Sequence, residues 1–368
     1  MLLTVISSLD VFCRQQACEK VAAAHPGAAV VLHDLHEDGT VLRRLFRDGL
    51  LSEREETPLE HGCLSCALRL EVVPTVRRLV EEGHRHVILG LPPGAAAAAV
   101  LDDLAGSDAG LRVNSTVMAC DPSALEDQIW DGHTLFESGY TPAHRDERTP
   151  GEFLIGELLY SDTVLLVTPE LVAVDAAVRG RGVLLARELA PHAQIAEITG
   201  NFRLGRHDRT ESSARSSPGA VQIPAASAAP FNTVLIKSRR PLHPERFRHA
   251  LPRLAEANCW LRGRLWVASA PQCRISIRGV GPRVWLESTG TWAADRKLSP
   301  ASQHLGSADA MLDWDAAVGD RGTVLAITGD GVSESEAAEL LAGCELTSSE
   351  MQAGAATLHD PFELSTSL

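Results

Sequence analysis

Lysine is scarce in this sequence. Of the 34 basic residues in the 368-residue chain, only those at positions 20, 237 and 297 are lysines, and positions 21 to 236 contain none. A reaction that needs a lysine in the first two thirds of the chain therefore has Lys20 as its single candidate.

Long apolar runs are also absent, and we expect no signal peptide in the first segment. No apolar stretch reaches the length of about 18 residues that a membrane-spanning helix needs. The first segment, MLLTVISSLDVF, lacks the basic region of a signal peptide. The net charge of −14 at pH 7 opposes direct binding to nucleic acid or to an anionic membrane. We therefore expect a cytoplasmic protein with neither of these partners.

The composition is that of a globular protein, with 45% hydrophobic and 22% charged residues. A chain of 368 residues is long enough for two domains. Its eight cysteines are expected to be reduced thiols, among which a close pair indicates metal or redox chemistry.

The first half of the chain alternates strand-like and helix-like patterns. Apolar strands are expected at 2–7, 28–35, 86–91, 112–120 and 163–167, and helical spacing lies between them at 10–24, 66–82, 95–104 and 151–160, then at 171–189. Asp10 can cap the first helix. This alternation predicts an α/β fold in which a mostly parallel sheet has helices on both faces.

The second half of the chain differs from the first in composition and in its pattern of apolar residues. Residues 205–230 are rich in Ser, Ala, Pro and Arg without periodicity, which predicts a flexible linker after a first domain at 1–204. Five of the six tryptophans lie beyond position 230, and strand patterns outnumber helices there. We expect a smaller α+β domain at 231–368 with an aromatic core.

A cysteine pair stands where a loop enters a predicted helix, in the segment E-H-G-C-L-S-C at 60–66. Thiols spaced as Cys63 and Cys66 can chelate one tetrahedral Zn²⁺ or a soft monovalent metal, and a helix start favours their thiolates. One pair is only half of a tetrahedral site. The remaining ligands would come from residues such as Glu60, His61, His33, His36, Cys13 or Cys18.

Two other interpretations of the pair stay open. A redox dithiol also has this spacing, but the flanks lack the strand, tryptophan and helix that usually surround one. Simple packing of two small side chains is the third interpretation.

Several motifs together resemble the CobW family of GTP-dependent metallochaperones. The family's G-C-I-C-C-T-L-R corresponds to G-C-L-S-C-A-L-R at 62–69. The carboxy half is similar to the CobW C-terminal domain at R-P-L-H-P-E-R (240–246), R-G-R-L-W-V-A (262–268), G-T-W (290–292), G-D-R (319–321) and D-P-F (360–362). The resemblance implies a P-loop-NTPase-like first domain followed by a CobW C-terminal domain.

The family's phosphate-binding loop is not preserved. Where relatives have G-x-x-G-x-G-K-T, this chain has S-L-D-V-F-C-R-Q-Q at 8–16, without glycine, so Ser8 begins the loop and Arg14 stands at the lysine position. Such a loop needs glycines for its backbone cradle and a lysine for the phosphate oxygens. Lys20 comes more than a helical turn too late.

The other nucleotide motifs are altered as well. The family's E-T-T-G corresponds to L-P-P-G at 91–94, where only Gly94 remains, and its N-K-x-D corresponds to V-T-P-E at 167–170, where Glu170 keeps a carboxylate. Loss of phosphate-cradle donors and of the lysine removes several kcal/mol of charge stabilisation. The sequence therefore predicts a pseudo-GTPase.

The resemblance implies a role in zinc homeostasis, with Zn²⁺ as the metal and a protein client or partner, and the altered motifs lead us to expect neither GTP nor Mg²⁺ as a ligand. Relatives with degenerate motifs are tied to zinc starvation and to ribosome hibernation, and the arginine-rich composition is typical of their high-GC genomes. The sequence leaves two alternatives: an active GTP-dependent metallochaperone with an atypical loop, and a ligand-free scaffold that recruits a partner.

Overall fold

The computed structural model describes residues 1–105, 110–168, 173–256, 258–296, 314–354 and 358–363. The chain divides into two compact units, Met1–Ser216 and Ser217–Leu368. Among the described residues, no helix is long and apolar enough to span a membrane.

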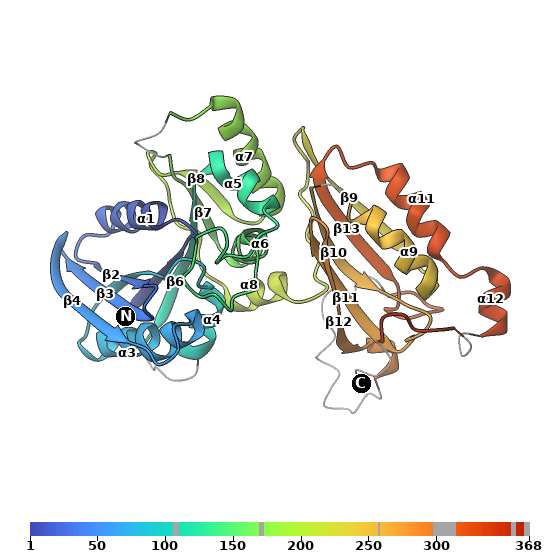
Figure 1. Cartoon of the computed structure of the whole chain (residues 1–368), viewed down its shortest axis with the longest axis horizontal. Coiled ribbons are helices and arrows are strands. Elements are labelled where there is room, and N and C mark those ends of the chain that lie inside the picture. Colours follow the sequence, from blue (N-terminus) through green and yellow to red (C-terminus); the bar gives the residue numbers. More distant parts are fainter. Residues whose placement is uncertain (106–109, 169–172, 257, 297–313, 355–357, 364–368) are drawn as a thin grey trace. The chain divides into compact units, whose positions relative to one another are not determined.

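An eight-stranded sheet forms the centre of the first unit, in the order β4-β3-β2-β5-β1-β6-β7-β8 (Figure 1). Strands β1, β2, β5, β6, β7 and β8 are parallel, which confirms the predicted sheet, and β3 and β4 add an antiparallel hairpin at one edge. The strands are β1 (Leu2–Ser7), β2 (Ala29–Leu35), β3 (Thr40–Arg47), β4 (Leu50–Pro58), β5 (His86–Gly90), β6 (Arg112–Cys120), β7 (Thr163–Leu166) and β8 (Gln194–Glu197).

Helices cover both faces of this sheet. Because side chains alternate along a strand, Val30 and Leu32 pack with α1, whereas Val31 packs with α2, α3 and α4. Figure 1 shows α1 and α3 on opposite sides of the sheet. The helices are α1 (Val11–Ala24), α2 (Leu64–Ala67), the π-helical turn η1 (Leu68–Val72), α3 (Val73–Glu81), α4 (Ala97–Leu104), α5 (Pro122–Trp130), α6 (Pro150–Tyr160), α7 (Ala176–Leu189) and α8 (Arg209–Ser216).

The predicted cap of the first helix is confirmed. The Asp10 carboxylate accepts a hydrogen bond from the Cys13 N–H at 2.7 Å, so α1 begins at Val11 and only three residues separate it from β1. This satisfies a helical N–H that would otherwise lack a partner.

Helix α8 lies inside the segment that the sequence predicted as a flexible linker. The Arg215 guanidinium donates to the Leu159 carbonyl at 3.1 Å, and the Ser212 side chain is fully buried. Because α8 carries almost no apolar residues, sequence periodicity could not reveal it. The boundary between the two compact units follows at Ser216.

The second unit has an antiparallel sheet in the order β12-β11-β10-β13-β9, with α9 and α11 packed against it (Figure 1). Trp260, Trp266 and Trp292 are buried, but none of them belongs to the hydrophobic cluster of this unit, which is mainly aliphatic, so the predicted aromatic core is wrong in this part. Its elements are β9 (Phe231–Ser238), α9 (Pro244–Leu254), β10 (Cys259–Leu265), β11 (Cys273–Val280), β12 (Arg283–Thr291), η2 (Ala293–Asp295), β13 (Thr323–Asp330), α11 (Glu334–Cys344) and α12 (Ser348–Ala353).

Candidate functional site

The cysteine pair lies at the start of a helix, as its spacing predicted. Cys63 caps α2, and its Sγ accepts a hydrogen bond from the Cys66 N–H at 3.3 Å. Gly62 makes this entry possible, since a Cβ there would lie 2.9 Å from the Cα of Gly39 in the β2–β3 turn. The close approach of the two turns therefore fixes the position of both thiols relative to the sheet.

The two thiols interact with each other. The hydrogen bond to Cys63 raises the pKa of the Cys66 thiol, and desolvation adds to this, while Arg69 acts in the opposite direction. We expected the helix start to favour thiolates. The pKa of Cys66 is raised instead of lowered, because the neighbouring sulfur opposes a second negative charge. Both residues are half-buried and remain reachable by a metal ion.

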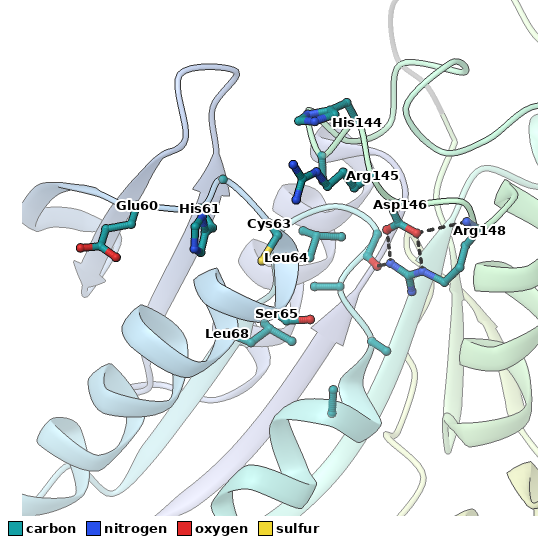
Figure 2. A pocket seen from close by; sticks show the side chains of 16 residues that line it. Glu60, His61, Cys63, Leu64, Ser65, Leu68, His144, Arg145, Asp146 and Arg148 are labelled. Atoms are coloured by element: carbon teal, nitrogen blue, oxygen red, sulfur yellow. Dashed lines mark hydrogen bonds and ion pairs between the residues drawn. The ribbon is translucent and has the colours of Figure 1, made fainter.

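A pocket of about 710 Å³ opens beside Cys63 (Figure 2). Three segments form its walls: residues 60–65 with Leu68, residues 94–96 with Ala99, and residues 143–146 with Arg148. Figure 2 shows Arg145 extending from the third segment toward the turn that carries Cys63. His144 and Arg145 could not be predicted as pocket residues, because nothing in the spacing connects positions 63 and 145.

The predicted metal ligands come together only in part. Glu60, His61 and Cys63 share the pocket, and Cys66 adjoins Cys63. Within the part of the chain that the structure describes, however, no group of three or more His, Cys, Asp or Glu side chains is placed to hold a metal ion. The protein thus presents two thiols at a pocket rather than a closed tetrahedral site.

The other candidate ligands do not join the pair. Cys13 and Cys18 are buried in the cluster around α1, on the opposite face of the sheet from α2. His33 is fully buried, and neither ring nitrogen has a hydrogen-bond partner. Its burial, together with the charges of Arg43 and Arg14, lowers its pKa to about 3, so the ring is neutral.

The loop between β1 and α1 is closed by its own side chains. The Ser8 hydroxyl accepts from the Asp10 N–H at 3.0 Å, and the Asp10 carboxylate occupies the helix end. A helix end of this kind is where phosphate binds in P-loop folds. Here that position already holds a carboxylate.

Arg14, at the lysine position of the lost motif, is fully buried. Its guanidinium donates to the carbonyls of His33 and Leu91 at 2.7 Å each and pairs with the Asp34 carboxylate at 2.5 Å. Its charge is therefore directed into the protein at the ends of β2 and β5.

Gly94 lies beside Ser8, since its N–H donates to the Ser8 carbonyl at 3.4 Å. Its φ of +76° is a conformation that favours glycine. The Gly94 carbonyl accepts from Arg148, and the residue lines the pocket beside Cys63. Glu170, the fourth predicted nucleotide position, lies outside the described residues.

Comparison with known proteins adds a family assignment for the second unit. Residues 231–345 match the family described as the cobalamin synthesis protein cobW C-terminal domain. The chain carries a CobW C-terminal domain. The match includes the motifs at 240–246, 262–268, 290–292 and 319–321 and confirms the resemblance that they indicated, whereas D-P-F at 360–362 lies outside it.

Two curated relatives align with both units. A protein of Mycobacterium tuberculosis named as a zinc chaperone is 26% identical over 88% of this chain and 83% of its own length. A Dictyostelium discoideum protein named zinc-regulated GTPase metalloprotein activator 1 is 22% identical over 84% of this chain and 70% of its own. Among solved structures, the Zn(II)-bound YjiA GTPase of E. coli aligns with 94% of this chain and 99% of its own, at 10% identity and a TM-score of 0.37.

Proposed function

We propose that this protein is a CobW-like zinc-binding protein that delivers or senses Zn²⁺ through a protein partner, without hydrolysing GTP. The observation that carries the metal part is the thiol pair of Cys63, which lines an open pocket, and Cys66, whose N–H donates to the Cys63 sulfur. The relatives named for zinc support the choice of ion. The name of the Dictyostelium relative supports a metalloprotein client as the partner.

Half-buried thiols suit a carrier better than a structural site. A structural zinc site is closed by four protein ligands, whereas a site that must release its ion keeps positions open. Two half-buried thiols beside a pocket allow an incoming ligand to reach the ion.

Zinc titration of the reduced full-length protein tests this proposal. We expect the double variant Cys63→Ser/Cys66→Ser to lose affinity by about two orders of magnitude or more, because zinc binding by thiolates is on the order of 10 kcal/mol. A chromophoric zinc chelator used as competitor gives both dissociation constants. Ser65→Ala is the matched control, since Ser65 is exposed between the two cysteines and should not alter affinity. Equal affinity in wild type and double variant would favour the ligand-free scaffold instead.

The β1–α1 loop is the feature that opposes GTP binding and hydrolysis. Three residues are too few to form the phosphate cradle, and the Asp10 carboxylate would repel a phosphate at the helix end. Arg14 cannot replace the missing lysine, because its buried guanidinium is already bonded to two carbonyls and to the Asp34 carboxylate.

Isothermal titration with GTP and Mg²⁺ tests this second part. We expect no binding tighter than about 1 mM, which corresponds to about 4 kcal/mol of binding free energy. The measurement is made on metal-free and zinc-loaded protein, so that a zinc-dependent nucleotide site would also be detected. Submillimolar binding in either state would support the alternative of an active GTPase with an atypical loop.

A further inference from the structure

The sheet of the second unit has two faces of different chemistry. Helices α9 and α11 lie on one side of it (Figure 1), and there Ile277 and Leu286 belong to the apolar packing. Because side chains alternate along a strand, the adjoining residues on β11 and β12, Arg278 and Trp285, project to the opposite face. Arg278 and Trp285 are also partners in the antiparallel register, so they lie beside each other.

Arginine and tryptophan form a continuous ladder across β10, β11 and β12 on this opposite face. The Arg262 guanidinium lies 3.5 Å from the centre of the Trp260 ring, and Arg262 is the cross-strand partner of Arg278. The guanidinium groups of Arg278 and Arg283 lie 5.9 and 5.2 Å from the centre of the Trp285 ring. Like charges directly opposite each other destabilise a sheet, so a ladder of this kind favours an anionic partner.

One end of this ladder is accessible. Arg262 is buried, and its guanidinium donates to the Gln222 carbonyl at 2.6 Å, so the chain that precedes β9 lies over β10. On β11 and β12, by contrast, Arg278 is exposed, and both Arg283 and Trp285 are half-buried. These three residues, which we call the β11–β12 patch, can be reached by a ligand.

The patch lies in a basic part of an otherwise acidic chain. Residues 237–296 contain 12 lysine and arginine residues and 4 aspartate and glutamate residues, although the whole chain has a net charge of −14. Glu287, two residues after Trp285 on β12, projects to the same face, and its carboxylate accepts a hydrogen bond from the Ser276 hydroxyl at 3.3 Å. The expectation that net charge opposes a nucleic-acid partner therefore does not hold for this surface.

We propose that the β11–β12 patch binds single-stranded RNA. Unpaired bases stack on aromatic side chains with little dependence on sequence, while guanidinium groups bind the phosphates. Trp285 supplies the ring, and Arg278 and Arg283 supply the cations beside it. Glu287 repels phosphate, but its carboxylate can accept a hydrogen bond from the 2′-hydroxyl group that distinguishes RNA from DNA.

An acidic protein segment is the competing partner, since carboxylates also bind guanidinium groups. Glu287 disfavours such a segment, because it repels a second carboxylate and receives no hydroxyl donor in return. A nucleotide, with its phosphate, base and ribose hydroxyl, has a group for each kind of side chain on this surface.

Fluorescence anisotropy of a labelled oligouridylate of about 12 nucleotides, titrated with reduced full-length protein, measures the binding. We expect a dissociation constant in the micromolar range at about 50 mM salt, and weaker binding at about 200 mM, because phosphate contacts release counterions. An oligodeoxyuridylate of the same length and a capped oligoglutamate of the same charge are measured alongside as unlabelled competitors. Both should compete less well than unlabelled oligouridylate.

The double variant Arg278→Gln/Arg283→Gln should weaken RNA binding about tenfold or more, since it removes two phosphate contacts. Trp285→Leu should weaken it about fivefold or more, whereas Trp285→Phe keeps a stacking ring and most of the affinity. Arg248→Gln/Arg253→Gln is the matched control, because it removes the same charge from α9, on the other face of the sheet. Circular dichroism establishes that each variant is folded.

Three results overturn the RNA proposal. The first is that wild type does not bind the oligouridylate at the lower salt concentration. The second is that the patch variants bind as tightly as the α9 variant, which would place the contact elsewhere. The third is that a competitor binds as tightly as the oligouridylate: the oligoglutamate would assign the patch to an acidic protein, and the oligodeoxyuridylate would remove the selection for RNA.

Discussion

Replacing Arg14 by leucine should lower the free energy of unfolding by about 3–5 kcal/mol, the cost of removing one partner from a buried ion pair. The guanidinium is inaccessible to solvent and satisfies two backbone carbonyls and the carboxylate of Asp34. Leucine fills part of the space but leaves the two carbonyls without this donor, and it leaves the Asp34 carboxylate with Arg44 as its remaining partner. Urea unfolding followed by circular dichroism measures the change.

Arg44→Leu is the control for the Arg14 variant. Arg44 pairs with the other oxygen of the same carboxylate at 2.7 Å, but its side chain is one quarter exposed. Exposed pairs contribute about 1 kcal/mol or less, so we expect a small loss. Equal losses of unfolding free energy in both variants would show that the buried contacts of Arg14 do not stabilise the protein more than the exposed pair of Arg44.

Replacing Glu157 by glutamine should stabilise the protein above pH 7 and remove much of the pH dependence of its stability. Glu157, on α6, is buried, and the Ala97 N–H at the start of α4 donates to both carboxylate oxygens at 3.2 Å. Desolvation raises its pKa from 4.5 to about 7, against the lowering effects of Ser7, Ala97 and Arg148.

The sign of the Glu157 effect follows from proton linkage. The folded protein keeps a proton between about pH 4.5 and pH 7 that the unfolded chain releases. The stability associated with the neutral side chain is therefore complete below pH 4.5 and is lost as the pH rises through about 7. The total loss is about 3 kcal/mol, from 1.36 kcal/mol for each pH unit.

Unfolding measured between pH 5 and pH 8 tests this second prediction. Glu152→Gln is the control, because Glu152 lies on the same helix and its capping contact with Thr149 can also be made by glutamine. The unfolding free energy of that variant should depend on pH as steeply as that of the wild type. If Glu157→Gln kept the pH dependence of the wild type, Glu157 would not be the group that causes it.

The local patterns predicted those elements that bury an apolar face. The alternating segments of the first unit, the Asp10 cap and the strands of the second unit all follow from short-range spacing. The β3–β4 hairpin was missed because β4 is almost wholly exposed and has no apolar alternation. It is held by pairing with β3 and by cross-strand contacts such as that of Arg43 with Glu55.

The sequence by itself determined which chemistry is present. It showed two thiols in CxxC spacing at a helix start, and no glycine or lysine in the loop at 8–16, because these depend on residue identity and short distances. Only the tertiary structure decided what faces those groups. It brings Arg145 to the pocket beside Cys63 and buries Arg14 against Asp34, because chain crossovers join segments that sequence spacing cannot relate.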